Sequence, residues 1–193
     1  MATLKLNNTT VFTETNGIAS IPSAVKFPAG HVIQVVQSTY NAKVTFSSTL
    51  ADAMSVNLIT KQANSKFLVQ HHSQWGRGRD DYGGLWYYIN SGSGDTLISE
   101  AVGIGATGVQ TNLMSVISNR GDNASDVYFQ STHTDSYLHS PSLAKGVSVT
   151  YKLKAQCIYG TNVYLNGQDS TTNNSAHTFT FSTMTVMELS YDN

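Results

Sequence analysis

Charged residues are scarce in this sequence, and that scarcity sets the first limits on function. Asp, Glu, Lys and Arg together make up 12% of the 193 residues, well below the usual globular share of about 25%. The net charge is −1, and the densest basic cluster, Arg77 and Arg79, is followed at once by Asp80 and Asp81. Because nucleic-acid binding depends on clustered basic side chains that neutralise phosphates, we expect no nucleic-acid partner.

Disulfides and long hydrophobic runs are also missing. The single cysteine, Cys157, has no partner for an intrachain disulfide, and its apolar surroundings in the sequence predict a buried residue rather than a nucleophile. No stretch approaches the ~20 apolar residues of a membrane-spanning helix. The first ten residues lack the apolar core of a signal peptide. We therefore expect synthesis in a cytoplasm, without Sec-type export or membrane insertion.

Alternating apolar and polar residues are the main pattern that is present. The run 147–158 places six residues on one face, as in a strand that covers a core on one side: Val147, Val149, Tyr151, Leu153, Ala155 and Cys157. Further strand-like runs, separated by turns rich in Gly and Asn, are 31–40, 54–60, 66–70, 85–89, 112–118, 127–130 and 177–189. In the last run we expect an irregularity near Ser182. These features predict an all-β fold, an antiparallel β-sandwich or jelly roll with a short N-terminal β arm.

The arm is predicted for residues 1–27, and the sandwich for residues 28–193. The arm contains three short strand-like pieces, 4–6, 11–13 and 18–21, and Asn16-Gly17 is a hairpin signal between the last two. Such a segment is too small for a core of its own. We expect it to pack on another chain or on the sandwich, and to mediate assembly or attachment by adding a strand to a neighbour.

Three stretches together resemble a known group of proteins. They are 27–37, 137–142 with 150–153, and 182–189, and 162–167 lies between the last two. Their order and spacing are similar to virion proteins and fibre-tip modules of phages of marine bacteria, cyanophages among them. The resemblance implies a homotrimeric jelly roll or sandwich on the outside of a virion, with no catalytic residues. It implies a place in tail fibres, tail tips or the outer capsid. The sequence has no shaft and no recognisable virion-anchoring domain, which argues against a free-standing tail fibre and leaves room for a capsid decoration role.

The segment 74–86 is the strongest candidate for ligand contact. It gathers seven aromatic and charged residues in a glycine-rich stretch: Trp75, Arg77, Arg79, Asp80, Asp81, Tyr82 and Trp86. One hypothesis is a sugar-binding loop, in which an aromatic ring stacks on the sugar while Arg or carboxylate groups hold its hydroxyls. A second is a subunit contact, where Trp, Tyr and Arg are enriched. A third is a structural loop with paired Arg and Asp and with Trp86 in the core.

Metal and enzyme sites are weakly indicated. His133, Asp135 and His139 would share one face of an extended strand, but Ser140-Pro141 predicts a loop there, and we expect no metal and no cofactor. Asp80 and Asp81 are adjacent and would diverge, which disfavours the carboxylate pair of a glycoside hydrolase. The stretch 103–108 lacks the βαβ context of a dinucleotide site, and 120–126 is interpreted as a turn.

The pattern of strands predicts a non-enzymatic β domain that assembles with other protein chains, and the resemblance implies that it is a phage virion structural protein on the particle surface. The first hypothesis is a fibre or tail receptor-binding protein that assembles through β-rich interfaces and touches host glycans. The alternative is a capsid decoration protein bound to the major capsid lattice. A second alternative is a lectin-like carbohydrate-binding module or a depolymerase. The expected partners are copies of the chain itself, other virion proteins and a host surface glycan.

Overall fold

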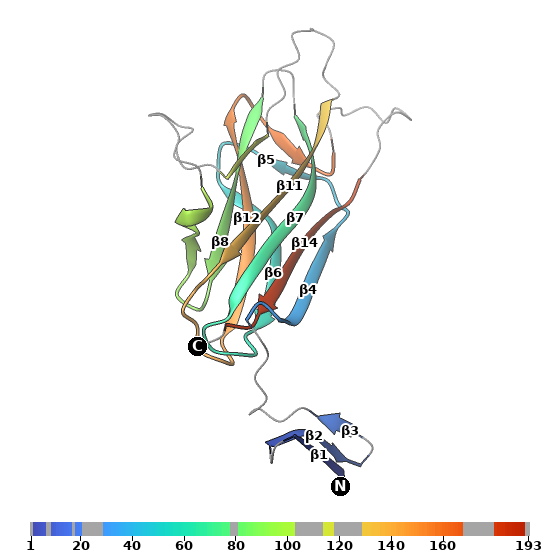
Figure 1. The fold of residues 1–193 in the computed structure, drawn as a ribbon. Coiled ribbons are helices and arrows are strands. Elements are labelled where there is room, and N and C mark those ends of the chain that lie inside the picture. Colours follow the sequence, from blue (N-terminus) through green and yellow to red (C-terminus); the bar gives the residue numbers. More distant parts are fainter. Residues whose placement is uncertain are drawn as a thin grey trace.

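The protein is an antiparallel all-β molecule, which confirms the predicted fold class (Figure 1). The structure is a computed structural model, and it describes residues 2–6, 9–16, 18–20, 29–77, 81–102, 114–117, 129–167 and 180–191. Within these ranges the one helix is a short 3₁₀ turn, η1 (Ser99–Ala101). The same ranges contain no helix that is long and apolar enough to cross a membrane.

One layer of the sandwich is a five-stranded sheet. Its strands are β6 (Ala51–Ile59), β8 (Tyr82–Asn90), β9 (Asp95–Leu97), β10 (Ser115–Ile117) and β12 (Ser148–Tyr159). The long strand β12 pairs with β6 on one side and with β8 on the other. Along the far edge of β8, β10 pairs with its first half and β9 with its second half.

The second layer is a six-stranded sheet built around β7. Its strands are β4 (Val32–Tyr40), β5 (Val44–Phe46), β7 (Lys66–Arg77), β11 (Phe129–His139), β13 (Val163–Leu165) and β14 (Ser182–Leu189). β11 follows one edge of β7 over its whole length. The other edge pairs first with β14 and then with β13, which in turn pair with β4 and β5.

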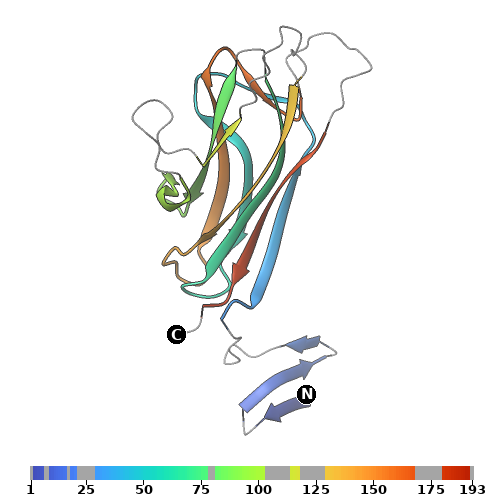
Figure 2. The ribbon, with the colours of Figure 1, turned by 45° about the horizontal axis from the view of Figure 1, so that its top comes forward.

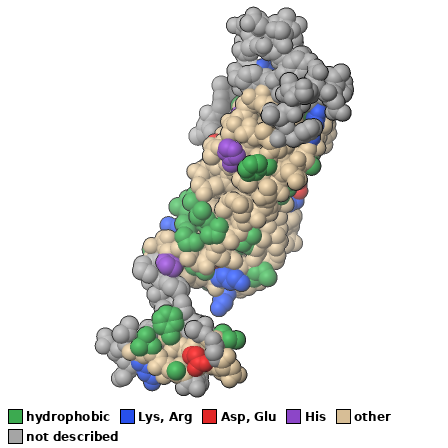
Figure 3. Space-filling model, turned by 90° about the vertical axis from the view of Figure 1, so that its right-hand side faces the viewer, with side chains coloured by type: hydrophobic (Ala, Val, Ile, Leu, Met, Phe, Trp, Pro, Cys, Tyr) green, Lys and Arg blue, Asp and Glu red, His purple; other side chains and the backbone are tan. Residues whose placement is uncertain are grey.

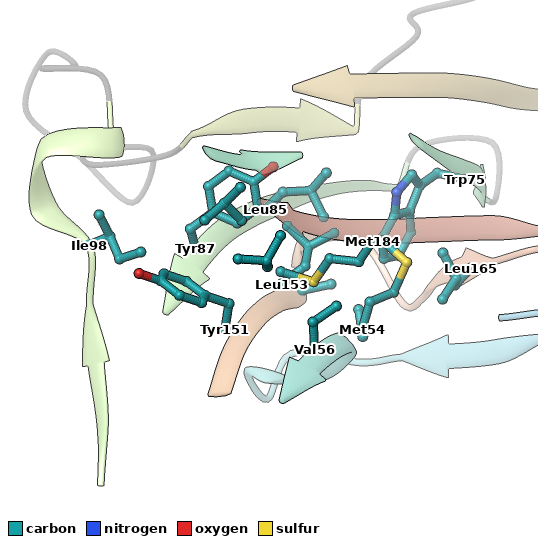
Figure 4. Packing of buried hydrophobic residues seen from close by; sticks show 14 of the residues in the cluster. Met54, Val56, Trp75, Leu85, Tyr87, Ile98, Tyr151, Leu153, Leu165 and Met184 are labelled. Carbon is teal, nitrogen blue, oxygen red and sulfur yellow. The ribbon is translucent and has the colours of Figure 1, made fainter. Parts of the chain in front are cut away.

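The core lies between the two sheets and consists of the inward residues of alternating strands. The predicted face of β12 is confirmed, because Val149, Tyr151, Leu153, Ala155 and Cys157 are all buried. Figure 4 shows how Met54 and Val56 of β6 and Leu85 and Tyr87 of β8 meet Trp75 of β7 and Met184 of β14. Burial of large apolar side chains at roughly 1.5–3 kcal/mol each makes this layer the main source of stability.

The N-terminal residues form a small sheet rather than an extended arm. Its strands are β1 (Ala2–Leu6), β2 (Thr9–Thr15) and β3 (Ile18–Ser20), in that order. Asn16 has a φ of 53° and Thr15 pairs with Ile18, so the predicted hairpin is confirmed. Figures 1 and 2 draw this sheet apart from the two sheets of the sandwich. The end of the predicted arm, 21–27, lies outside the described residues, and the division at residue 27 stays a prediction.

Two strands extend well beyond their predicted bounds. β7 continues from the predicted run 66–70 to Arg77, and β11 reaches from Phe129 to His139 where only 127–130 was expected. The inward positions in these extensions include polar side chains such as His71 and His133, so a pattern of apolar alternation does not detect them. In β14 the register shift lies between Glu188 and Leu189 instead of near Ser182.

Candidate contact surfaces and the predicted ligand loop

Trp75, the first residue of the predicted ligand segment, lies in the core. Its side chain is completely buried on β7, and its indole Nε1 donates a hydrogen bond to Ser73 Oγ at 2.7 Å. Its ring centroid is 5.5 Å from that of Phe46, which closes the core at this end. A sugar in solvent has no contact with this ring, so Trp75 is removed from the predicted ligand site.

Arg77 and Asp81 stabilise the backbone around the segment. Arg77 is buried at the end of β7, and its Nη1 donates to the carbonyl oxygen of Asp81 at 3.4 Å. The Asp81 carboxylate accepts from the backbone N–H groups of Thr161 at 2.7 Å and Asn162 at 3.2 Å. Asp81 thereby holds the turn between β12 and β13, which is a structural role. Arg79 and Asp80 lie outside the described residues.

Tyr82 and Trp86 are the members of the segment that reach the outer face of the five-stranded sheet. Tyr82 stacks on Tyr159 of β12, with ring centroids 5.4 Å apart and planes 12° from parallel. On β8, Leu85 and Tyr87 are fully buried, so the intervening Trp86 points outward and is half-buried. The hypothesis that places Trp86 in the core is therefore wrong, and of the two tryptophans in the predicted ligand segment it is Trp75 that lies in the core.

Four charged side chains lie beside Trp86 on the same outer face. The Lys152 ammonium is 2.7 Å from Asp52 Oδ2 and 3.0 Å from Asp95 Oδ2. The Lys154 ammonium is 3.1 Å from Asp52 Oδ1 and 2.6 Å from Asp95 Oδ2, and it lies over the ring of Tyr88 at 4.9 Å. We call this surface the aromatic–charged face, defined by its six residues: Asp52, Trp86, Tyr88, Asp95, Lys152 and Lys154.

On the aromatic–charged face each ammonium group contacts both carboxylates. Hydrogen bonds from Lys154 and then Lys152 hold the pKa of Asp95 well below its ordinary value. The carboxylates of Asp52 and Asp95 raise the pKa of Lys152. Two ammonium groups and two carboxylates sum to zero charge, so the face offers many hydrogen-bonding groups without a net field for an ionic ligand.

The outer face of the six-stranded sheet has the opposite character. A row near one end of the sheet crosses four strands in register and is apolar: Val35 of β4 lies beside Met187 of β14, Met187 beside Leu68 of β7, and Leu68 beside Leu138 of β11. We call these four residues the apolar row. Lys66 lies just beyond this row, with its Nζ 5.5 Å from the centre of the Tyr191 ring.

Beyond the apolar row, the same face carries neutral polar side chains. Two successive rows across β4, β14, β7 and β11, and a third on β7 and β11 alone, hold ten of them: Gln37, Thr185, Gln70, Ser136; Thr39, Thr183, His72, Thr134; Gln74 and Thr132. Neighbours hydrogen-bond across strands, such as Gln37 Nε2 to Thr185 Oγ1 at 2.8 Å and Gln74 Nε2 to Thr132 Oγ1 at 2.6 Å. We call the apolar row and these rows together the uncharged face. Figure 3, seen from the side of β4 and β14, shows few charged side chains and a hydrophobic patch toward the lower end of the sandwich.

A polar cluster lies inside the sandwich, under β11. His133, Asp135 and His139 share the inward face of this strand, as predicted from their spacing. His71 Nδ1 and Tyr87 Oη are 2.7 Å apart, and His71 Nε2 is 3.7 Å from Asp135 Oδ2. Burial lowers the pKa of His71 to about 3, so its imidazole is neutral at ordinary pH. No group of three or more potential metal ligands is assembled within the ranges described.

The remaining sequence candidates add no site. Cys157 is buried, as predicted, and burial raises the pKa of its thiol to about 11. Its Sγ donates to the carbonyl oxygen of Tyr159 at 3.2 Å, which is a structural contact. The stretches 103–108 and 120–126 lie outside the described residues.

Sequence reasoning did not identify either outer face, although one signal was available. The alternation in 147–158 already assigns Lys152 and Lys154 to the face opposite the core. What that alternation does not show is which strands flank β12. The partners Asp52 and Asp95 come from β6 and β9, at sequence distances that no local pattern connects.

Comparison with known proteins identifies no family for this chain. No family model matches the chain, and no curated protein matches it. Among solved structures, a chain from the structure of infectious bursal disease virus, Gx strain, aligns with a TM-score of 0.40 and 8% sequence identity. The alignment covers 93% of this chain and 40% of that chain, so this protein spans less than half of the other's length. A likeness at this level carries no inference about function.

Proposed function

We propose that this chain is a non-enzymatic structural protein on the surface of a phage virion, where it assembles with copies of itself and with other virion proteins. The observation that carries the proposal is the uncharged face. Across β4, β14, β7 and β11 it presents one apolar row and two rows of Gln, Thr, Ser and His, and a third polar row lies on β7 and β11. The phage source rests on the sequence resemblance described above.

The lack of charge on this face favours contact with another protein over exposure to water. A face that stays in water usually carries interspersed charges, which repel other molecules and keep the protein soluble. Neutral hydroxyl and amide groups hydrogen-bond equally well to water or to a second protein surface, and their burial has no large charge-desolvation cost. An apolar row beside them gains free energy when a partner covers it, at roughly 25 cal/mol per Å². The uncharged face is therefore suited to permanent contact with protein.

Assembly can be tested by placing a charge in the middle of this face. The variant Gln70→Lys should reduce incorporation into purified particles several-fold, counted by quantitative mass spectrometry, because a buried ammonium without a partner is costly. The matched control is Asn57→Lys, an exposed residue on the outer face of the five-stranded sheet. Equal incorporation of both variants would contradict the proposal. Hundreds of copies of the parent protein per particle would indicate capsid decoration, and a few dozen or fewer would indicate a tail or fibre.

The aromatic–charged face supports the receptor-binding form of the proposal. Trp86 and Tyr88 lie two residues apart on the same side of β8, and a flat aromatic ring attracts the C–H groups of a sugar through its negative π face. Beside them, Asp52, Lys152 and Lys154 supply donors and acceptors for hydroxyl groups. Because the charges of the face sum to zero, we favour a neutral glycan over a sialylated or sulfated one.

A glycan array with the whole protein tests this form. Trp86→Ala should lose about tenfold or more in binding, as expected for an aromatic anchor in a contact surface. Tyr191→Ala is the control, since Tyr191 is an exposed aromatic residue that does not belong to the aromatic–charged face. Loss of chain length in the bound polysaccharide would instead indicate a depolymerase. Absence of binding to any array member would leave the decoration alternative.

A further inference from the structure

The small N-terminal sheet exposes apolar side chains that nothing in its own strands covers. Leu4 of β1 lies directly opposite Phe12 of β2, on one face of the sheet. Their exposed fractions are 55% and 46%. Three short strands without a covered hydrophobic face do not form a stable unit in water. The Leu4–Phe12 pair therefore needs a surface to pack against.

The apolar row of the sandwich has the matching requirement. Val35 and Leu138, at the two ends of the row, are exposed by 55% and 46%. Leu68 and Met187 lie between them in register, so the row is continuous across four strands. The chain enters the sandwich nearby, because the N–H of Gly30 donates to the carbonyl oxygen of Ser190, three residues beyond Met187.

We propose that the Leu4–Phe12 face of the N-terminal sheet of one copy packs on the apolar row of a second copy. This inference rests on the proposed function, because it identifies the contact by which the copies assemble. In the single chain four of these apolar side chains are exposed to solvent: Leu4, Phe12, Val35 and Leu138. Contact between two chains would cover both surfaces at once, and an exchange of N-terminal sheets around a closed ring would cover them in every copy.

The chemistry of the two surfaces agrees with this partner. Leu4, Phe12 and the four residues of the apolar row carry no charge, so contact between these side chains buries no ion. Glu14, which pairs with Ala2 on the same face as Phe12, lies beside this contact. The proposed contact also differs from addition of a single strand. β1 and β3 both pair with β2, so the N-terminal residues are available as a preformed face. The outer edges of β1 and β3 remain as the places where strand addition would occur.

Charge substitution in the full-length chain tests the proposal. Phe12→Asp on the N-terminal sheet and Leu138→Asp on the apolar row should each weaken self-association about tenfold or more, measured by sedimentation equilibrium. The control for the first is Ile18→Asp, on the opposite face of the same small sheet and more exposed at 71%. The control for the second is Ile59→Asp, exposed on the five-stranded sheet. Circular dichroism of each variant establishes that the sandwich is folded.

Cysteine cross-linking identifies which chain provides each surface. Mixed chains with Phe12→Cys and Met187→Cys should form a disulfide-linked species of twice the chain mass, since the native Cys157 is buried. Cross-linking within a single chain that carries both substitutions, without a change in mass, would overturn the proposal. Self-association that persists in both aspartate variants would also overturn the proposed contact, but it would not contradict the proposed function, because the chain would still assemble. Absence of the protein from purified particles would instead contradict the proposed function, and the cross-linking result would not be affected.

Discussion

Glu188 gives the sharpest test of how this fold is held together. It is a completely buried carboxylate on β14, and its acceptor atoms meet the turn between β6 and β7. Oε1 accepts from the backbone N–H groups of Lys61 at 2.9 Å and Gln62 at 3.0 Å and from Ser65 Oγ at 2.7 Å. Oε2 accepts from Gln34 Nε2 and, at 3.0 Å, again from Lys61. One carboxylate thus joins β4, β14 and the β6–β7 turn.

The substitution Glu188→Gln keeps the shape but replaces one acceptor oxygen with an NH₂ group. If the remaining oxygen keeps the position of Oε1, the new NH₂ faces the Gln34 amide and the Lys61 N–H, which are both donors. The Gln34 amide can turn its oxygen toward the new donor only by losing its bond to the carbonyl oxygen of Ile59, and the Lys61 contact is lost. Hydrogen bonds to a charged group contribute about 1.5–3 kcal/mol each. We therefore expect a loss of about 2 kcal/mol in the free energy of unfolding, and about 4 kcal/mol for Glu188→Ala, which removes both acceptors.

Thermal and urea unfolding measure this loss. For a chain of this length, 1 kcal/mol corresponds to roughly 2–4 °C in Tm, so Glu188→Gln should melt about 4–8 °C below the parent protein. Glu100→Gln is the control, because Glu100 is exposed on the 3₁₀ turn. If Glu188→Gln unfolds with the same midpoint as the parent, the buried acceptor network does not stabilise the β6–β7 turn and this account of it is wrong.

Two further predictions concern the interior. Gly83→Ala should destabilise by about 1–3 kcal/mol in urea unfolding, because a Cβ there would lie 2.8 Å from the backbone oxygen of Gln156 and 3.0 Å from Val163 Cγ2; an unchanged midpoint would show that β8 and β12 can separate. Burial lowers the pKa of His71 from 6.5 to about 3, so between these pH values the unfolded chain binds a proton that the folded chain does not. The free energy of unfolding should therefore fall as pH decreases from 6.5 toward 3. This group contributes at most about 1.4 kcal/mol per pH unit. Burial also lowers the pKa of His133, which changes the free energy of unfolding in the same direction. In His71→Phe the free energy of unfolding should therefore depend less on pH. Equal pH dependence in the variant and the parent would contradict this prediction.

The sequence predicts the strands whose inward residues are apolar and misses those whose inward residues are polar. β12 was expected within one residue of its bounds, because its buried positions are all apolar. β11 was expected only at its first residues, because His133, Asp135 and His139 occupy its inward positions. The two histidines find partners on the opposite sheet: His133 Nδ1 is 3.3 Å from Ser115 Oγ, and His139 Nδ1 is 3.0 Å from Tyr151 Oη. Such partners depend on the tertiary fold and leave no local pattern.

The burial of Trp75 and the outward position of Trp86 have a related cause. In β8, residues 85–88 read Leu-Trp-Tyr-Tyr, so both faces of the strand carry large apolar or aromatic side chains, and alternation does not indicate which face lies toward the core. The neighbouring strands determine this instead. Trp86 lies opposite Lys154, whose face is set by the clear alternation of β12, while Leu85 lies opposite Ala155 in the core. Pairing with a strand about 70 residues later in the sequence therefore determines which residues of the predicted loop reach the surface.

The two outer faces of the sandwich meet water in different ways, and this difference is the physical basis of the proposed assembly. Among described residues, the five-stranded sheet places Asp52, Asp95, Lys152 and Lys154 on its outer side. The six-stranded sheet has Lys66 at one margin of its outer side and Lys43, over Tyr164, at the other, and its uncharged face between them carries no Asp, Glu, Lys or Arg. A low overall charge alone would not produce this, since four charges could have been divided evenly. Concentrating them on one side keeps that side soluble and leaves the other free to be covered without burying an ion.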